Sequence, residues 1–160
     1  MYHYANAPGR STQTSRQVIS QFFSTATNGL PGNDDSGAMG SYVVSYLAGL
    51  YPVPATRQYL LSSSYFPSIS FFNPIFNTTT TIKATNFVGN PANGTGGTVF
   101  VQNVTIDGVP AKSNCFLDWD VFQKGSTIEL TLTDDINVTC GGNGTDALPP
   151  SLSTGGFDTV

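Results

Sequence analysis

Hydrophobic residues recur at helical spacing only in the first third of the chain. One apolar stripe predicts a helix near residues 11–27, and Asn28-Gly29 marks its end. A second stripe predicts another helix near residues 36–50, which Pro52 ends. The first stripe consists of Val18, Ile19, Phe22 and Phe23, and the second of Met39, Val43, Tyr46, Leu47 and Leu50.

After Pro54 the pattern changes to short runs of β-branched and aromatic residues, which are typical of strands. Asp107-Gly108, between two such runs, is a strong signal for a tight hairpin turn. In the last run, residues 127–132, apolar and polar residues alternate, which predicts one buried face and one solvent-exposed face. The expected strands are 60–61, 69–71, 80–84, 99–106, 114–119 and 127–132.

Together these patterns predict an α+β fold. Two N-terminal helices are followed by an antiparallel β-sandwich or sheet unit over residues 57–135. Residues 136–160 are rich in Gly, Pro and Ser and poor in apolar side chains, which predicts a disordered tail.

Composition excludes two classes of partner. The net charge is -4, and the six Lys and Arg residues are spread thinly. Without a basic patch, nucleic acid is not an expected partner. No apolar run is long enough to span a membrane, so no membrane span is expected.

Five N-x-Ser/Thr sequons follow residue 76 and favour a secretory history. The first ten residues nevertheless lack the basic and apolar regions of a signal peptide. We therefore expect a secreted protein, or one in the secretory pathway, whose N-terminal part is missing from this chain. The expected N-glycosylation sites are Asn77, Asn93, Asn103, Asn137 and Asn143.

The two cysteines, Cys115 and Cys140, are expected to form a disulfide in an oxidising compartment. Such a bond closes a loop of about 25 residues and stabilises the fold by about 3 kcal/mol. The alternative is two unrelated thiols. Their spacing does not match a metal site, and no histidine cluster accompanies them.

The densest polar cluster is Gly-Leu-Pro-Gly-Asn-Asp-Asp-Ser-Gly over residues 29–37, between the two expected helices. The start of a helix favours ionised carboxylates, and a positioned carboxylate can act as a general base or as a ligand for a hard cation. The same residue types are also common in turns and helix caps. The pattern alone favours this structural interpretation.

The longer run from residue 29 to 42, followed by Leu-Ala-Gly-Leu-Tyr-Pro-Val-Pro over 47–54, resembles the hallmark stretch of glycoside hydrolase family 92. Segments 4–10, 59–63, 101–108, 116–120 and 125–130 also resemble parts of that family. The similarity runs from about Tyr2 to about Asp135. It identifies the chain as the C-terminal part of a fungal-type α-mannosidase. Residues 1–56 would then hold the last helices of an (α/α)6 barrel.

The resemblance implies a calcium-dependent, inverting exo-α-mannosidase that acts on N-glycans or mannan. Asp35 is expected to be the catalytic base, with Asp34 as its supporting partner. Asn33 and Gly32 are expected to bind substrate, and Asn33 and Asp35 to contribute to the calcium site. The family's general acid and its Asn-Glu-Pro stretch lie upstream of this chain, so the chain alone is expected to be inactive.

Two other functions stay open at this point. The chain could be a non-catalytic module that binds α-mannoside glycans or the missing N-terminal part of the enzyme. It could also belong to a glycoprotein-deglycosylating amidase of the peptide N-glycanase type. The sequence offers no Cys–His pair to support amide hydrolysis, because Cys115 is expected to be bridged.

Overall fold

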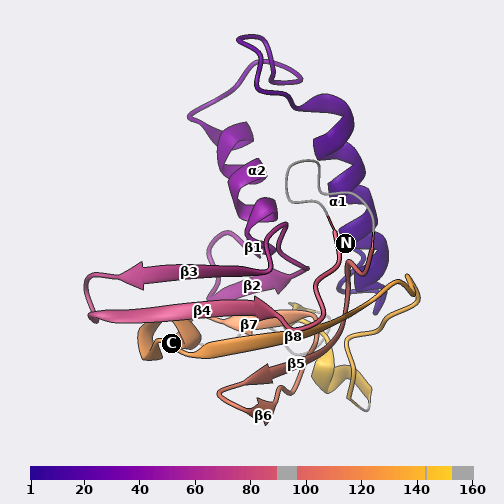
Figure 1. Ribbon diagram of the computed structural model, residues 1–160, viewed down its shortest axis with the longest axis vertical. Coiled ribbons are helices and arrows are strands. Elements are labelled where there is room, and N and C mark those ends of the chain that lie inside the picture. Colours follow the sequence, from indigo (N-terminus) through magenta and orange to yellow (C-terminus); the bar gives the residue numbers. More distant parts are fainter. Residues whose placement is uncertain (90–96, 143, 153–160) are drawn as a thin grey trace.

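The computed structural model describes residues 1–89, 97–142 and 144–152, and it has two helices standing on one side of two β-sheets (Figure 1). Helix α1 spans Pro8–Phe22 and helix α2 spans Ala38–Leu47. Both are shorter at their C-terminal ends than the hydrophobic stripes predict. Proline is favoured at the first helical position because its missing N–H is not needed there, and Pro8 starts α1 in this way.

The smaller sheet is antiparallel and has the strand order β1-β2-β7. Its strands are Leu50–Pro52, Gln58–Leu61 and Phe116–Asp118. Leu50 lies in β1 rather than in the second helix, which corrects the longer stripe expected there. Pro52 is tolerated because β1 is an edge strand, where a missing N–H breaks no ladder.

The larger sheet has the strand order β3-β4-β8-β5-β6. Its pairs are antiparallel except β4 with β8, which run parallel, so the expected antiparallel unit holds with this one exception. Asp107 and Gly108 form the expected tight turn between β5 and β6, and both have positive φ. The strands are Ser68–Asn73 (β3), Thr78–Ala84 (β4), Phe100–Ile106 (β5), Val109–Pro110 (β6) and Thr127–Thr133 (β8).

The core lies where the two sheets meet. Ile128, Leu130 and Leu132 all point into it, which confirms the alternation predicted for this strand. A short helix, α3 (Asp120–Lys124), was not predicted, and it places Phe122 in the same core. The rest of the core cluster is Leu50, Leu61, Ile82, Val101, Val104, Leu117 and Val121.

The segment after β8 packs against the sheets, where the sequence predicted a disordered tail. Cys140, Ala147 and Pro149 are fully buried, and residues Gly144–Ala147 form a 3₁₀ helix. The expectation of disorder failed here because a few apolar residues of this segment are buried and the disulfide ties Cys140 to Cys115. Residues 143 and 153–160 lie outside the described part of the chain.

Candidate functional site

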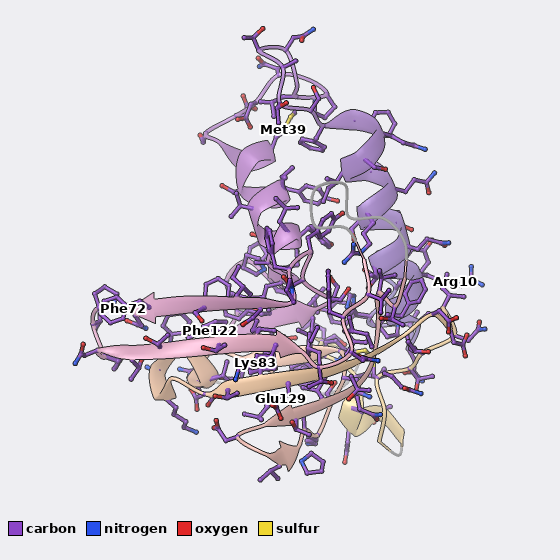
Figure 2. The ribbon with its side chains drawn as sticks, in the orientation of Figure 1. Arg10, Met39, Phe72, Lys83, Phe122 and Glu129 are labelled. Carbon is purple, nitrogen blue, oxygen red and sulfur yellow. A yellow bond between two sulfur atoms is a disulfide. The ribbon has the colours of Figure 1, made fainter. Side chains whose placement is uncertain are left out.

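The predicted site residues lie in the connection between α1 and α2, at the end of the helices that is far from the sheets (Figure 1). Figure 2 shows Met39, from the first turn of α2, at this same end. The connection turns back on itself: the N–H of Ser24 donates to the backbone oxygen of Gly29 at 3.0 Å, and the N–H of Gly29 donates to that of Ala26 at 2.9 Å. A Cβ at Gly29 would lie 2.1 Å from the backbone oxygen of Ser24, so only glycine fits this turn.

Asp34 is held at the start of α2. Its Oδ1 accepts a hydrogen bond from the backbone N–H of Met39 at 2.9 Å, and its side chain is partly buried. The cap position itself is Gly37, which has no side chain to offer. Asp34 therefore satisfies one of the free N–H groups of the first turn, and its negative charge is stabilised by the helix dipole.

Asp35 is exposed beside it. Its backbone oxygen accepts the N–H of Ala38 at 3.1 Å, which closes the turn into the helix. The next two residues, Ser36 and Gly37, both have positive φ. This arrangement uses the backbone of Asp35 for structure and leaves its side chain at the surface, open to solvent or to a ligand.

The two residues expected to bind substrate are also exposed. Asn33 and Gly32 lie just before the carboxylates, and an added Cβ at Gly32 would be 3.5 Å from the terminal carbon of Met39. The structure thus brings Gly32, Asp34 and Met39 together and leaves Asn33 and Asp35 on the outer surface of the connection.

The donor set does not fit a complete calcium site. Calcium takes six to eight oxygen ligands. Among residues 1–89, 97–142 and 144–152, no group of three or more His, Cys, Asp or Glu side chains could hold a metal ion. One oxygen of Asp34 is already occupied by Met39. This chain by itself therefore offers part of a coordination shell at most.

The remaining acids belong to the sheet unit and the segment after it. Asp118 and Asp120 both pair with Arg57, and Asp107 accepts the N–H of Thr127 at 2.7 Å. These carboxylates stabilise local structure far along the chain from Asp35. They provide no second carboxyl group facing it.

A row of aromatic rings runs from the connection between α1 and α2 to strand β1. Phe23, Tyr42, Tyr46 and Tyr51 form a continuous row with ring centroids 6.1, 4.7 and 5.7 Å apart. Burial and the neighbouring Tyr42 and Tyr51 raise the pKa of Tyr46 to about 12, against an opposing effect of Ser11 in α1. This row fixes α2 against α1 and β1, and so it supports the loop at the far end.

Sequence reasoning missed a shallow aromatic cleft on the sheets. It has a volume of about 320 Å³. The ring of Phe122 lies at its centre, with the rings of Tyr59 and Trp119 at 5.0 and 6.1 Å. No sequence motif predicts this cleft, because its residues come from strands and a helix that are far apart in the chain. The lining is Leu50, Tyr59, Phe71, Phe72, Asn73, Pro74, Trp119 and Phe122.

The expected disulfide is present. Cys115 and Cys140 are bonded, with 4.8 Å between their Cα atoms, and both are fully buried. Of the five sequon asparagines, Asn77, Asn103 and Asn137 are exposed. Asn93 and Asn143 lie outside the described residues. In the part of the chain that the structure describes, no helix has both the length and the apolar character needed to cross a membrane.

Comparison with known proteins places this fold and loop in a family. The model described as "Glycosyl hydrolase family 92 catalytic domain" matches residues 1–134. An "Uncharacterized secreted glycosidase" of Arthroderma benhamiae is 35% identical over 155 residues. That match covers 97% of this chain and 19% of the relative, so the chain spans about a fifth of the relative's length.

Solved structures agree on the fold. A family GH92 α-mannosidase from Bacteroides thetaiotaomicron, in complex with mannoimidazole, has a TM-score of 0.75 and 20% identity, over 94% of this chain and 19% of that one. A family GH92 inverting mannosidase from the same organism has a TM-score of 0.76 and 19% identity, over 95% of this chain and 19% of that one.

Proposed function

Because this chain belongs to glycosyl hydrolase family 92, we propose that its α1–α2 connection supplies the general-base side of an inverting exo-α-mannosidase site. The structural relatives described as an α-mannosidase and as an inverting mannosidase support this choice of substrate and stereochemistry. The proposed substrates are the α-mannosides of N-glycans or mannan. The homologue described as secreted supports a secreted or secretory location.

One observation carries the assignment of roles. Asp34 is tied to the N–H of Met39, whereas the adjacent Asp35 is exposed with only its backbone engaged. A base must reach a water molecule, so the exposed carboxylate suits that role. Asp34 suits a positioning role, since its bond to the helix start holds the backbone that carries Asp35.

The proposed reaction needs two carboxyl groups on opposite sides of the sugar, about 6.5–9.5 Å apart. Asp35 takes a proton from water as the water oxygen bonds to the anomeric carbon. The bond from that carbon to the leaving oxygen breaks, and a carboxylic acid protonates this oxygen. Among the described residues no carboxyl group is placed against Asp35, so we assign the acid to the part of the family's catalytic domain that this chain does not cover.

We propose that a calcium ion binds between this chain and the rest of the catalytic domain, with ligands from both. The side-chain oxygens of Asn33 and Asp35 are exposed and of the type that calcium prefers. We assign the other ligands to the part of the family's catalytic domain that this chain does not cover, because the described residues hold no larger cluster. When bound, such an ion would hold sugar hydroxyl groups. The partner of this chain is therefore the rest of the family's catalytic region.

Two alternatives differ in how much supports them. A non-catalytic glycan-binding module is supported by the aromatic cleft around Phe122, because rings can pack on sugars. The amidase alternative loses its support, because Cys115 and Cys140 are the chain's two cysteines and both are in the disulfide. No thiol remains to attack an amide.

The deciding experiment is a chimera. This chain replaces the matching segment of the Arthroderma benhamiae secreted glycosidase, which supplies the upstream part. We expect the chimera to release mannose from an aryl α-mannoside. Asp35→Asn should lower kcat about 10²–10⁴-fold, the usual contribution of a general base. The control Asp146→Asn changes an exposed acid in the 3₁₀ helix and should leave kcat unchanged.

Three outcomes contradict the proposal. Full activity in Asp35→Asn would exclude this residue as the base. Hydrolysis of other glycosides in preference to α-mannosides would exclude the proposed substrate. A folded chimera that binds mannosides without any turnover would favour the binding-module alternative.

A further inference from the structure

The connection between β3 and β4 presents an apolar patch at the outer end of the larger sheet. We call it the hairpin-tip patch and define it as Phe72, Ile75 and Phe76, which are 62%, 85% and 45% exposed. Figure 2 shows Phe72 at the end of this hairpin, projecting away from the rest of the molecule. Large exposed apolar side chains gathered in one turn are a common mark of a surface that another group covers.

The turn that carries the patch is well defined. Oδ1 of Asn73 accepts the backbone N–H groups of Ile75 and Phe76, at 3.1 and 3.4 Å. The backbone oxygen of Phe122 in α3 accepts hydrogen bonds from Asn73 Nδ2 and Thr78 Oγ1. The hairpin tip is therefore anchored to α3 on its inner side. The patch is exposed, and Phe72 also lies at the edge of the cleft around Phe122.

Asn77 is the last residue of this turn. It is exposed and has φ of 51°, a left-handed conformation that asparagine tolerates better than most residues. It is followed by Thr78 and Thr79, which complete an N-x-Thr sequon. Thr79 pairs directly with Phe72 across the strands, and Asn77 follows Phe76 in the sequence. Both ends of the sequon therefore adjoin the patch.

We propose that Asn77 carries an N-linked glycan whose first N-acetylglucosamine packs its apolar C–H face on Phe72 and Phe76 and so covers the hairpin-tip patch. The sugar ring has one face lined by C–H bonds, and aromatic rings gain large apolar contacts at low entropic cost. The glycan is attached to the same turn, so it reaches the patch without a separate binding step. This role does not depend on mannosidase activity.

The attachment is an ordinary transfer reaction. Nδ2 of Asn77 bonds to the anomeric carbon of an oligosaccharide carried on a lipid pyrophosphate. The bond from that carbon to the pyrophosphate oxygen breaks, and Nδ2 loses one proton. A transferase of the secretory pathway supplies the catalysis.

Asn137 offers a matched comparison. It is also an exposed sequon asparagine, but its Nδ2 donates to Asp135 at 3.0 Å. None of the large exposed hydrophobic residues of the described chain lies between positions 130 and 145. Asn137 therefore has no large exposed hydrophobic residue as a neighbour in the sequence, and we expect a glycan there to leave stability unchanged.

The test uses the 160-residue chain secreted from a yeast host, trimmed by an endoglycosidase to one N-acetylglucosamine at each occupied site. Mass spectrometry reports occupancy at Asn77. We expect the trimmed protein to have a Tm about 2–4 °C above that of Asn77→Asp, which removes the sequon with a residue that also tolerates the left-handed conformation of this position. In the Phe72→Thr/Phe76→Thr background this difference should vanish, while Asn137→Gln should change Tm in neither background.

The sugar–ring contact is also measured directly, so that the conclusion does not depend on how the variants fold. We expect nuclear Overhauser effects between the sugar ring protons and phenylalanine ring protons in the trimmed protein, which Phe76→Thr removes in part. An unmodified Asn77 would overturn the proposal. So would a Tm gain that persists in the double variant, or the absence of any sugar–ring contact.

Discussion

His3 and Leu61 are 58 positions apart in the sequence, yet Nε2 of His3 hydrogen-bonds with the backbone oxygen of Leu61 at 2.8 Å. The imidazole is almost completely buried, and its Nδ1 has no hydrogen-bond partner. This contact fastens the N-terminal turn to the central strand of the smaller sheet. It also makes the fold sensitive to pH, because protonation would place a charge where the second nitrogen is unsatisfied.

Acid should therefore destabilise the chain through His3. Burial lowers the pKa of His3, and the nearby N-terminal ammonium group lowers it further, against the opposing effect of the hydrogen bond to Leu61. The unfolded chain then binds the proton more tightly than the folded one. The free energy of unfolding is highest above the unfolded pKa of about 6.5 and falls below it, by at most about 1.4 kcal/mol per pH unit.

Urea unfolding measured between pH 8 and pH 4 checks this prediction. In His3→Gln the slope between pH 6.5 and the folded pKa should disappear, although the variant is less stable at pH 8. An equal slope in both proteins would assign the acid sensitivity to carboxylates instead.

Asp34→Ala should destabilise the chain by about 0.5–2 kcal/mol, the usual cost of losing a helix cap. The physical reason is that the N–H of Met39 loses the carboxylate oxygen that accepts its hydrogen bond, at the start of a helix with no buried residue. The matched control is Asp35→Ala, whose side chain is exposed. In chemical unfolding, the free energy of unfolding of Asp34→Ala should be clearly lower than that of Asp35→Ala. Equal free energies would contradict the capping role.

Removing the disulfide should cost about 3 kcal/mol, because the bond between Cys115 and Cys140 spans 25 positions. Since Cys140 and Ala147 belong to one buried cluster, the segment after β8 should become accessible first. Limited proteolysis of Cys115→Ser/Cys140→Ser should cut within residues 136–152 before it cuts the sheets. Simultaneous cleavage throughout the chain would show that this segment is not a separate unit.

The 160-residue chain alone should release no mannose from an aryl α-mannoside, with or without calcium. Asp35, the proposed base, is exposed, but no carboxyl group among the described residues is placed to protonate the leaving oxygen. Circular dichroism establishes that the assayed chain is folded. Turnover that Asp35→Asn abolishes would mean that the chain holds a complete site.

The parts of the fold that follow from local pattern were predictable. The alternation of Ile128, Leu130 and Leu132 predicted the buried face of β8, and Asp107-Gly108 predicted the β5–β6 turn. Helix α3 was not, because five residues hold too little periodicity to distinguish a helix from a turn. The parallel pairing of β4 with β8 depends on tertiary packing, which no local pattern contains.

The candidate site was predictable only as a location. The Gly-Asn-Asp-Asp cluster does lie at the start of a helix, as its residue types indicated. The resemblance alone assigned Asp35 as base and Asp34 as its supporting partner. The capping bond of Asp34 was not visible in the pattern, because it reaches five residues along the chain to Met39. The aromatic cleft around Phe122 joins residues from Leu50 to Phe122, and its assembly needs the complete fold.

Because β8 lies between β4 and β5, the larger sheet cannot complete its strand pairing until β8 has been synthesised. Strands β4 and β5 emerge first, but each gains its central partner only when residues 127–133 have left the exit tunnel. Until then both present unpaired backbone edges and the apolar face that holds Ile82 and Val104. A nascent chain that stalls before Thr127 is therefore the form most exposed to aggregation, and the form that most needs a chaperone.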